Sequence, residues 1–463
     1  MSKAACRLPF HVVMRLSPLR RAFWVGCALA LPACGTPEQP TNSPATTPTT
    51  PPAPTGDPPP AEPAVAGVYE LKSADPTADD ADLAPFDEMI ETTELVGLGE
   101  TVHTSGGYHR MRNRLVRHMI EKLGFRAVAL ETPWATAEVA TKYVETCQGS
   151  TKAASASIFG VFASVEMASL FEWLCAWNTS HPTDKVAFWG YDVQDSWADA
   201  AILRAFVKTA DPSKTDVVTA LNACIGAKYD TIQEYLASPE GKAELEGRDY
   251  ATDAENDQCK AAISAARAWL EADTSALAAA TSDFEVRRAK LALDGIEAYQ
   301  AKMFRFNAEP ITSFEARDTG MAKALMGMRD LRSPSKRVAV IAHNTHLAHA
   351  GSKIGGYWGG ARVMGQILRE DHKASYEAFA LAAQEVKINW ANFEDPPLAD
   401  GKDAVEKMLF GLGKPLLLVD LQANAVITPG KEHELQAERM VPSAQFRGLV
   451  YLEKSEAMKY APR

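Results

Sequence analysis

The feature that most limits how this chain can fold is a set of six short apolar runs, separated by longer helical patterns. The runs cover residues 94–98, 126–130, 186–191, 338–342, 376–381 and 415–419. Continuous apolar runs of this length are typical of strands buried on both faces of a parallel sheet. Between the first two runs, apolar residues at four-residue spacing predict a helix with one apolar stripe: Met111, Leu115, Met119 and Leu123. The sequence therefore predicts an α/β fold, with a mostly parallel central sheet flanked by helices in three α/β/α layers.

Composition limits the class of protein. Hydrophobic residues make up 46% of the 463 residues, which is enough for a large core, so a disordered or fibrous chain is excluded. The formal net charge of −11 argues against nucleic acid as a partner, because phosphate binding needs a basic surface. An enzyme or a small-molecule-binding protein remains, and the sequence does not set its oligomeric state.

Residues 1–33 have the pattern of a bacterial signal peptide of the lipoprotein type. Basic residues precede an apolar run at 22–33, which is too short to span a bilayer. The run ends in Leu-Pro-Ala-Cys34, which resembles the lipobox, where the cysteine is lipidated and becomes the new N-terminus. An ordinary cleavage site is the alternative, and Met14 is an alternative start. Either way we expect an exported protein. Lipidated Cys34 would anchor it to a bacterial membrane of the cell envelope, with the outer membrane favoured.

Residues 34–65 are predicted to be a linker between this anchor and the folded part. Residues 35–65 hold eleven prolines and no Lys or Arg, so the segment cannot bury a core. A disordered tail is the alternative. The folded domain is then expected at 66–463, with a helical insertion at about 195–310 where long runs of Ala, Leu, Lys, Glu and Asp replace the strand pattern.

Four cysteines remain in the predicted domain, an even number for an oxidising compartment. None forms a C-x-x-C pair, which argues against metal binding and redox catalysis. Three pairings are possible, and we predict the pairing of sequence neighbours, Cys147 with Cys175 and Cys224 with Cys259.

Chemically active side chains follow the predicted strands. They are Glu100 and His103 after the first run, Glu131 after the second, Asp192 after the third, His343 after the fourth and Asp420 after the sixth. In open α/β sheets, ligands bind outside the carboxyl ends of the strands. We therefore predict a functional site at this edge. For Asp192 and Asp420 taken singly, capping of the next helix is the favoured interpretation.

Six of the ten histidines lie in two windows at strand ends, His103, His109 and His118 in one and His343, His346 and His349 in the other. We predict that His103, His343 and His346 are functional, and that the other three are exposed helix residues. The three-residue steps from His343 to His349 do not keep one face of a helix, so a zinc site is a minor alternative and no metal or cofactor is predicted.

Nucleophile and nucleotide motifs are missing from the sequence. It contains no G-x-S-x-G, no P-loop and no H-E-x-x-H. Histidines beside carboxylates then favour general-base catalysis on water.

Several segments resemble the erythromycin esterases. Gly99-Glu-Thr-Val-His103 is followed by Arg110-Met-Arg112, Gly124-Phe125 and Ala129-Leu-Glu131. Further along are Trp189-Gly-Tyr-Asp192, Arg317-Asp318 with Met321, Ala342-His-Asn-Thr-His346 and Met364-Gly365. The likeness covers about residues 85–460. The Glu-x-x-His and His-Asn-x-His elements together are fairly specific for the family.

The resemblance implies a metal-independent hydrolase that opens the lactone of macrolide antibiotics or cleaves another ester. By position, His103 matches the proposed general base, while Glu100, Arg112, His343 and His346 match further residues needed for activity. Glu131 matches an acidic position beside them. Glu100 or Glu131 would orient His103 and favour its protonated form. Arg112, or the pair His343 and His346, could stabilise the oxyanion.

One departure from the family leaves two further hypotheses open. The family usually reads His-Gly-Thr-x-Glu, whereas this chain reads His103-Thr-Ser-Gly-Gly107. A catalytically inactive homologue is therefore one alternative. The other is an exported lipoprotein of the same superfamily that binds haem or another small ligand, since clustered histidines can supply axial ligands.

Overall fold

A computed structural model describes residues 65–333, 336–351, 359–390, 393–435 and 437–462. The predicted signal peptide, Met14, Cys34 and almost all of the linker lie outside these residues. In the described part of the chain, no helix combines the length and the apolar character needed to cross a membrane.

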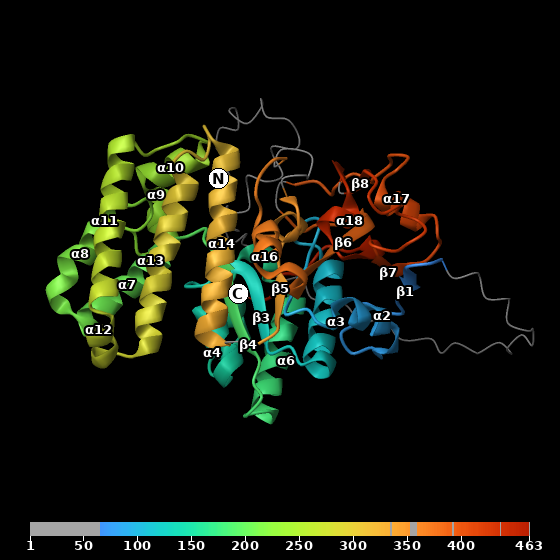
Figure 1. Cartoon of the computed structure of the whole chain (residues 1–463), viewed down its shortest axis with the longest axis horizontal. Coiled ribbons are helices and arrows are strands. Elements are labelled where there is room, and N and C mark those ends of the chain that lie inside the picture. The colour runs from blue at the N-terminus through green and yellow to red at the C-terminus, as the bar shows by residue number, and fades with distance from the viewer. Residues whose placement is uncertain (1–64, 334–335, 352–358, 391–392, 436, 463) are drawn as a thin grey trace, which may run out of the picture.

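A mixed sheet forms the centre of the molecule (Figure 1). Across the sheet, the described strands lie in the order β1 (Val68–Glu70), β7 (Leu416–Asp420), β10 (Gly448–Ser455), β6 (Tyr376–Val386), β2 (Leu95–Leu98), β5 (Val338–Ile341), β3 (Ala127–Pro133) and β4 (Ala187–Asp192). The neighbours from β10 to β4 are parallel, and only β7 among the described strands runs against them. All six predicted runs are strands, and the predicted, mostly parallel sheet is confirmed.

Helices cover both faces of this sheet. One face is packed by α2 (Ala84–Ile90), α3 (Gly106–Leu123), α4 (Glu138–Thr146) and α6 (Val165–Ser180), with the short α5 (Thr151–Ala156) beside them. The other face is packed by α14 (Pro310–Arg332), α15 (Asn344–Leu347), α16 (Met364–His372) and α17 (Val405–Phe410). Alternate residues of β3 enter the two cores, Ala127 and Ala129 on one side and Val128 and Leu130 on the other. This alternation produces the predicted three layers.

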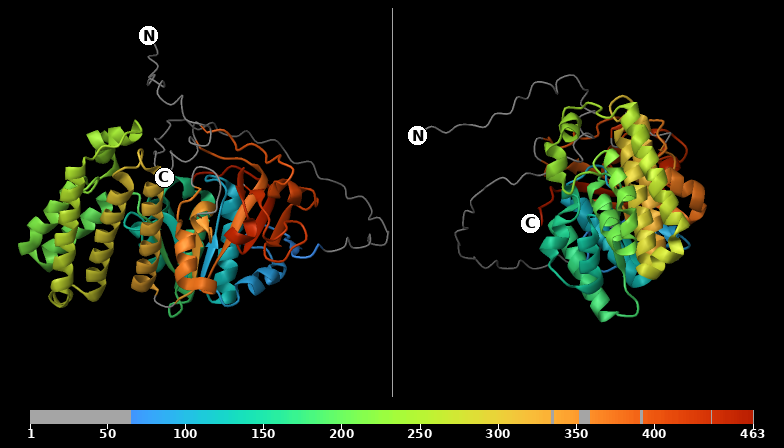
Figure 2. Two further views of the ribbon diagram at one scale, coloured as in Figure 1. Left: turned by 45° about the horizontal axis from the view of Figure 1, so that its top comes forward. Right: turned by 90° about the vertical axis from the view of Figure 1, so that its left-hand side faces the viewer.

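Residues 197–332 are built mainly from helices. Between β4 and α14 lie α7 (Trp197–Ala210), α8 (Thr215–Thr219), α9 (Ile232–Ala237), α10 (Pro239–Leu245), α11 (Asp253–Ala272), α12 (Thr274–Ala280) and α13 (Asp283–Met303). Figures 1 and 2 show that they form a lobe beside the sheet, beyond its β4 edge. Near the other end of the sheet lie a small hairpin, β8 (His433–Leu435) with β9 (Glu438–Met440), and α18 (Pro442–Gln445). The division into a domain with an insertion at 195–310 stays a prediction.

Two disulfides link helical segments. Cys147 at the end of α4 is bonded to Cys175 in α6, and Cys224 is bonded to Cys259 in α11. The predicted pairing of sequence neighbours is confirmed.

Candidate active site

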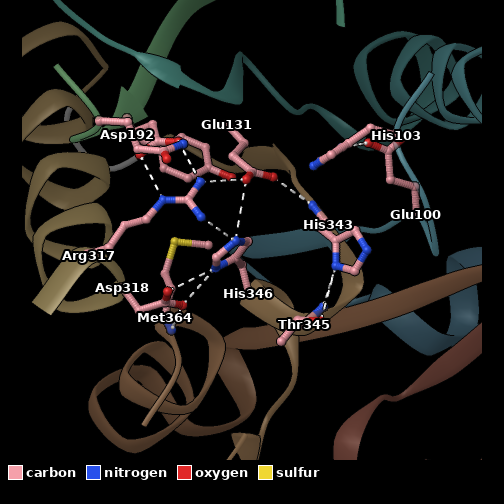
Figure 3. Close-up of polar contacts among 12 residues, drawn as sticks. Glu100, His103, Glu131, Asp192, Arg317, Asp318, His343, Thr345, His346 and Met364 are labelled. Atoms are coloured by element: carbon pink, nitrogen blue, oxygen red, sulfur yellow. Dashed lines mark hydrogen bonds and ion pairs between the residues drawn. The ribbon is translucent and has the colours of Figure 1, made fainter. Parts of the chain in front are cut away.

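Four parallel strands deliver polar side chains to one edge of the sheet. Glu100 and His103 follow β2, Glu131 and Asp192 lie near the ends of β3 and β4, and His343 follows β5. Figure 3 shows these side chains gathered around one centre, with His103 on one side and Arg317 on the other.

Asp420 does not join this group. Its strand, β7, is antiparallel to β10, and Asp420 pairs in register with Gly448 at the start of β10. It therefore lies at the opposite edge of the sheet, where it forms an ion pair with Arg447. Asp420 therefore lies outside the predicted site, because an apolar run does not reveal the direction of its strand. The capping favoured for Asp420 is also wrong, since the next helix, α18, has Val441 as its N-cap residue.

Glu100 and His103 form a carboxylate–histidine pair. His103 Nδ1 lies 2.6 Å from Glu100 Oε1, and the other carboxylate oxygen forms an ion pair with Arg112 at 2.9 Å and approaches His109 Nε2 at 3.6 Å. Although burial opposes ionisation, the charge of Arg112 and the bond to His103 hold the pKa of Glu100 well below its usual range. Burial disfavours the imidazolium too, but the bond to ionised Glu100 raises the pKa of His103.

A strained turn places His103 before α3. Thr104 has a φ of +66°, a left-handed conformation that glycine adopts without cost. The backbone carbonyl of Thr104 accepts hydrogen bonds from the N–H groups of Asn389 and Met458, which hold the turn in place. Thr104 is the first departure from the family pattern, and a threonine is strained in a conformation that glycine adopts readily.

The second departure, Gly107, is explained by packing. A Cβ on Gly107 would lie 2.4 Å from Oγ and 3.0 Å from Cα of Ser455 in β10, so a larger side chain would force Ser455 to shift. Ser105, the residue before α3, also bonds Ser455, at 2.7 Å between hydroxyls. The carboxylate that His103 contacts is that of Glu100.

A second cluster is centred on Arg317 of α14. Arg317 donates to both carboxylate oxygens of Asp192, from Nε at 3.2 Å and Nη2 at 2.7 Å, and to Glu131 from Nη2 at 2.8 Å. Its Nη1 lies 3.0 Å from His346 Nε2, and since arginine only donates, that nitrogen of His346 accepts. His346 Nδ1 then carries the proton and donates it to Asp318 at 2.9 Å. This cluster fixes which ring nitrogen of His346 carries the proton.

His343 is engaged at both ring nitrogens. Nε2 donates to the carbonyl of Thr101 at 2.8 Å, and Nδ1 accepts from the backbone N–H of Thr345 at 3.3 Å. Its own backbone N–H donates to Glu131 at 2.8 Å. Burial and the neighbouring His103 lower the pKa of His343 to about 4, so it is neutral at pH 7. Burial works against the ionised form of Glu131, but the neighbouring groups, with the Arg317 guanidinium among them, lower its pKa to about 2.

These groups surround a cavity of about 40 Å³. Its floor is buried and its mouth is partly exposed. The floor is lined by Glu131, Phe162, His343 and His346, and the mouth by His103, Phe159, Val161, Gln194 and Arg317. At roughly 10–15 Å³ for each water-sized group, the cavity accepts about three such groups. It is therefore large enough for a carbonyl group and an attacking water but not for a whole drug-sized ligand.

Several predictions about polar residues of the helices are wrong. His109 and His118 are buried, bonded to Ser164 at 2.8 Å and to Asp87 at 2.6 Å respectively. His349 is also largely covered, and its Nε2 accepts from the backbone of Ala378. These contacts exist because segments far away in the sequence cover the outer faces of the helices.

Asp192 and Arg112 also differ from expectation. Asp192 does not cap α7, whose N-cap residue is Ser196; it holds Arg317 instead. Arg112 is buried against Glu100 and does not line the cavity, so it is not placed to bind an oxyanion. Sequence reasoning missed Arg317 and Asp318 as site residues. They lie within a helix, and their only signal is the Arg-Asp pair of the family resemblance.

The three histidines at 343, 346 and 349 do not converge. The ring nitrogens of His343 and His346 are engaged as described, and His349 contacts Ala378 and Tyr376. Among the residues that the structure describes, no group of three or more His, Cys, Asp or Glu side chains is arranged to hold a metal ion.

Comparison with known proteins identifies the family of this chain. The family model described as erythromycin esterase matches residues 120–460, most of the chain. The chain belongs to this family. The predicted resemblance is thereby confirmed. Glu131, Arg317, His343 and His346 lie inside the matched segment, whereas Glu100 and His103 precede it.

The relatives of this erythromycin esterase family member are distant. The Bacillus subtilis (strain 168) protein described as "Putative hydrolase YbfO" is 21% identical over 408 residues, 81% of this chain and 87% of that protein. Erythromycin esterase type II of Escherichia coli is 23% identical over 286 residues, 58% of this chain and 63% of that protein. A mutant of the erythromycin esterase EreC in its open conformation superposes with a TM-score of 0.67 at 18% identity, over 85% of this chain and 98% of that one. This last likeness supports the α/β fold.

Proposed function

We propose that this protein hydrolyses an ester or lactone by a metal-independent reaction in which His103 activates water. One observation carries the proposal. Of the three histidines that line the cavity, only His103 has a ring nitrogen, Nε2, for which the described residues provide no partner, while its Nδ1 is held by Glu100. A histidine held in this way by a carboxylate is the usual form of a general base.

The reaction follows from this geometry. His103 Nε2 takes a proton from water as the water oxygen bonds to the carbonyl carbon, and the carbonyl electrons move onto oxygen. Glu100 stabilises the imidazolium that forms. When the carbonyl reforms, the bond to the alkoxy oxygen breaks and His103 returns its proton to that oxygen. An ester gives an acid and an alcohol, and a lactone gives one open-chain hydroxy acid.

The substrate that the family and its named relatives favour is a macrolide lactone. The cavity supports a reaction in which only the scissile group enters, with the rest of the substrate at the mouth beside Phe159 and Val161. Simple esters and lactones are therefore part of the test. We propose in addition that lipidated Cys34 anchors the protein in the cell envelope, on the pattern of residues 1–34. Mass spectrometry of the N-terminal peptide, compared with a Cys34→Ser variant, tests that anchor.

The first experiment incubates the purified protein with a panel of macrolides, simple lactones and alkyl esters and measures products by mass spectrometry. We expect a gain of about 18 Da for the ring-opened lactone, unchanged by EDTA and abolished by His103→Ala. His181→Ala, at a surface histidine that stacks on Trp177, is the matched control. Loss of activity with EDTA would assign the reaction to a metal. Absence of turnover on the whole panel would refute hydrolysis of these substrates and leave the binding or inactive hypotheses.

A further inference from the structure

The proposed reaction needs a hydrogen-bond donor for the oxyanion, and the cavity leaves few candidates. The carboxylate of Glu131 cannot donate. His346 Nε2 accepts from Arg317 and has no proton to give. His343 donates its Nε2 proton to Thr101 and uses Nδ1 as an acceptor. His103 must keep its proton for the leaving oxygen. Sequence reasoning suggested Arg112 or the pair His343 and His346, and none of these has a suitable donor facing the cavity.

Arg317 has a donor with a permanent positive charge, which the other residues that line the cavity lack. A guanidinium carries five N–H groups. Nε gives one to Asp192, Nη2 gives one each to Asp192 and Glu131, and Nη1 gives one to His346. The second N–H of Nη1 has no acceptor among the described residues, and Arg317 lines the cavity opposite His103 (Figure 3).

The same contacts hold this N–H in a fixed direction. The guanidinium is planar, and bonds to three partners leave it little freedom to rotate. Although burial opposes the charge, Asp192 and Glu131 raise the pKa of Arg317 and so keep it a cation. A fixed, charged donor stabilises developing negative charge without having to reorganise.

We propose that Arg317 is the oxyanion-binding residue of this site. The inference rests on the proposed hydrolysis. As the oxygen of water bonds to the carbonyl carbon, the carbonyl oxygen becomes negative and accepts the second N–H of Arg317 Nη1. As the alkoxy oxygen leaves, the carbonyl reforms and this bond weakens. Asp192 and Glu131 are positioning residues, since they act by holding the guanidinium.

The test compares Arg317→Lys and Arg317→Ala with the wild-type protein on a substrate that the wild type hydrolyses. Removing one oxyanion donor lowers kcat by about 100–1,000-fold in other hydrolases, with little change in substrate binding. We expect such a loss for Arg317→Ala, a loss of at least about 10-fold for Arg317→Lys, and KM within about 3-fold of wild type. Arg288→Lys is the matched control, because Arg288 forms a similar two-pronged contact with Glu138 far from the cavity.

A second readout separates oxyanion binding from general damage to the site. A trifluoromethyl ketone analogue of the substrate forms a hydrate that resembles the tetrahedral intermediate. Its inhibition constant should rise in each Arg317 variant by the same factor as kcat/KM falls. Arg317→Lys retains the positive charge between Asp192 and Glu131, so it keeps the test valid if Arg317→Ala unfolds.

Three results would overturn the inference while leaving hydrolysis intact. They are kcat within about 5-fold of wild type in Arg317→Lys and Arg317→Ala, a loss confined to KM, and unchanged affinity for the ketone in a variant whose kcat has fallen. If the wild-type protein hydrolyses nothing in the panel and does not bind the ketone, the proposed function fails and the inference fails with it.

Discussion

Replacing Glu100 by glutamine tests the proposed base directly. The side chains are nearly equal in size, and Glu100 is fully buried, so the change is mainly chemical. Glutamine can present its carbonyl to Arg112, which places its NH2 group against His103 Nδ1. In the wild-type protein that nitrogen lies 2.6 Å from a carboxylate oxygen of Glu100. Because an NH2 group donates, His103 Nδ1 must accept. The ring proton then moves to Nε2, so this nitrogen no longer has the lone pair that accepts a proton from water.

The expected magnitude follows from this change of tautomer. The equivalent carboxylate-to-amide change in a serine protease lowers kcat about 10⁴-fold. His103 also loses the neighbouring charge that stabilises its imidazolium. We therefore expect kcat/KM to fall by roughly 10³–10⁴-fold, which corresponds to about 4–5.5 kcal/mol of transition-state stabilisation.

The pH profile gives an independent readout of the same residue. A general base works when it is deprotonated, so activity rises with pH through the pKa of His103. Glu100 raises that pKa, which places the acid limb of wild-type kcat/KM above the ordinary histidine value of about 6.5. In Glu100→Gln, burial remains and the carboxylate charge is gone. The acid limb of the residual activity should move to lower pH.

The assay measures kcat/KM from pH 5 to 9 on a substrate of the wild-type protein, with thermal unfolding to verify the fold. Asp87→Asn is the matched control, since it removes a carboxylate that lies 2.6 Å from His118 away from the cavity. It should leave kcat/KM within about 2-fold. Activity of folded Glu100→Gln within 10-fold of wild type, or an acid limb that does not move, would refute the reasoning.

Three further predictions concern stability. Gly107→Ala should lower the free energy of unfolding by about 1–3 kcal/mol in urea titrations, because its Cβ would lie 2.4 Å from Ser455 Oγ. Replacing Cys224 and Cys259 by alanine should cost about 3–4 kcal/mol, since the disulfide closes a loop of 35 residues. Burial raises the pKa of Asp195 to about 7, so folding favours its protonated form and stability falls as pH rises from about 4 to 7. In Asp195→Asn, the difference in the free energy of unfolding between pH 5 and pH 8 should be smaller than in the wild-type protein by roughly 2–4 kcal/mol.

The central strands could be predicted because burial on both faces leaves a simple pattern. Each of the six apolar runs coincides with a strand, and the parallel strands bring Glu100, Glu131, Asp192 and His343 to one edge. The pattern does not predict β10, in which Glu453 and Lys454 follow the apolar half of the strand. Nor does it give the direction of β7, because an antiparallel strand can be equally apolar.

The environment of α3 could not be predicted from its own residues. The helix has one apolar stripe, and two of its polar residues, His109 and His118, were expected to face water. Instead, Arg114 pairs with Asp82, His118 with Asp87 and Glu100 with Arg112. Thirteen of its 18 residues are buried. A single sequence does not show which distant carboxylate neutralises a buried cation, so polar helices that are covered on several sides look like surface helices.

The same limit explains why Arg317 was missed, and it shows how the two histidine–carboxylate pairs differ. His103 on Glu100 and His346 on Asp318 have the same kind of partner at Nδ1. The two histidines differ at Nε2. Arg317 donates to Nε2 of His346 and so occupies its lone pair, whereas no described residue approaches Nε2 of His103 in this way. In the proposed reaction, one arginine, 125 residues beyond Asp192 in the sequence, thus determines which of two similar histidines acts as the base.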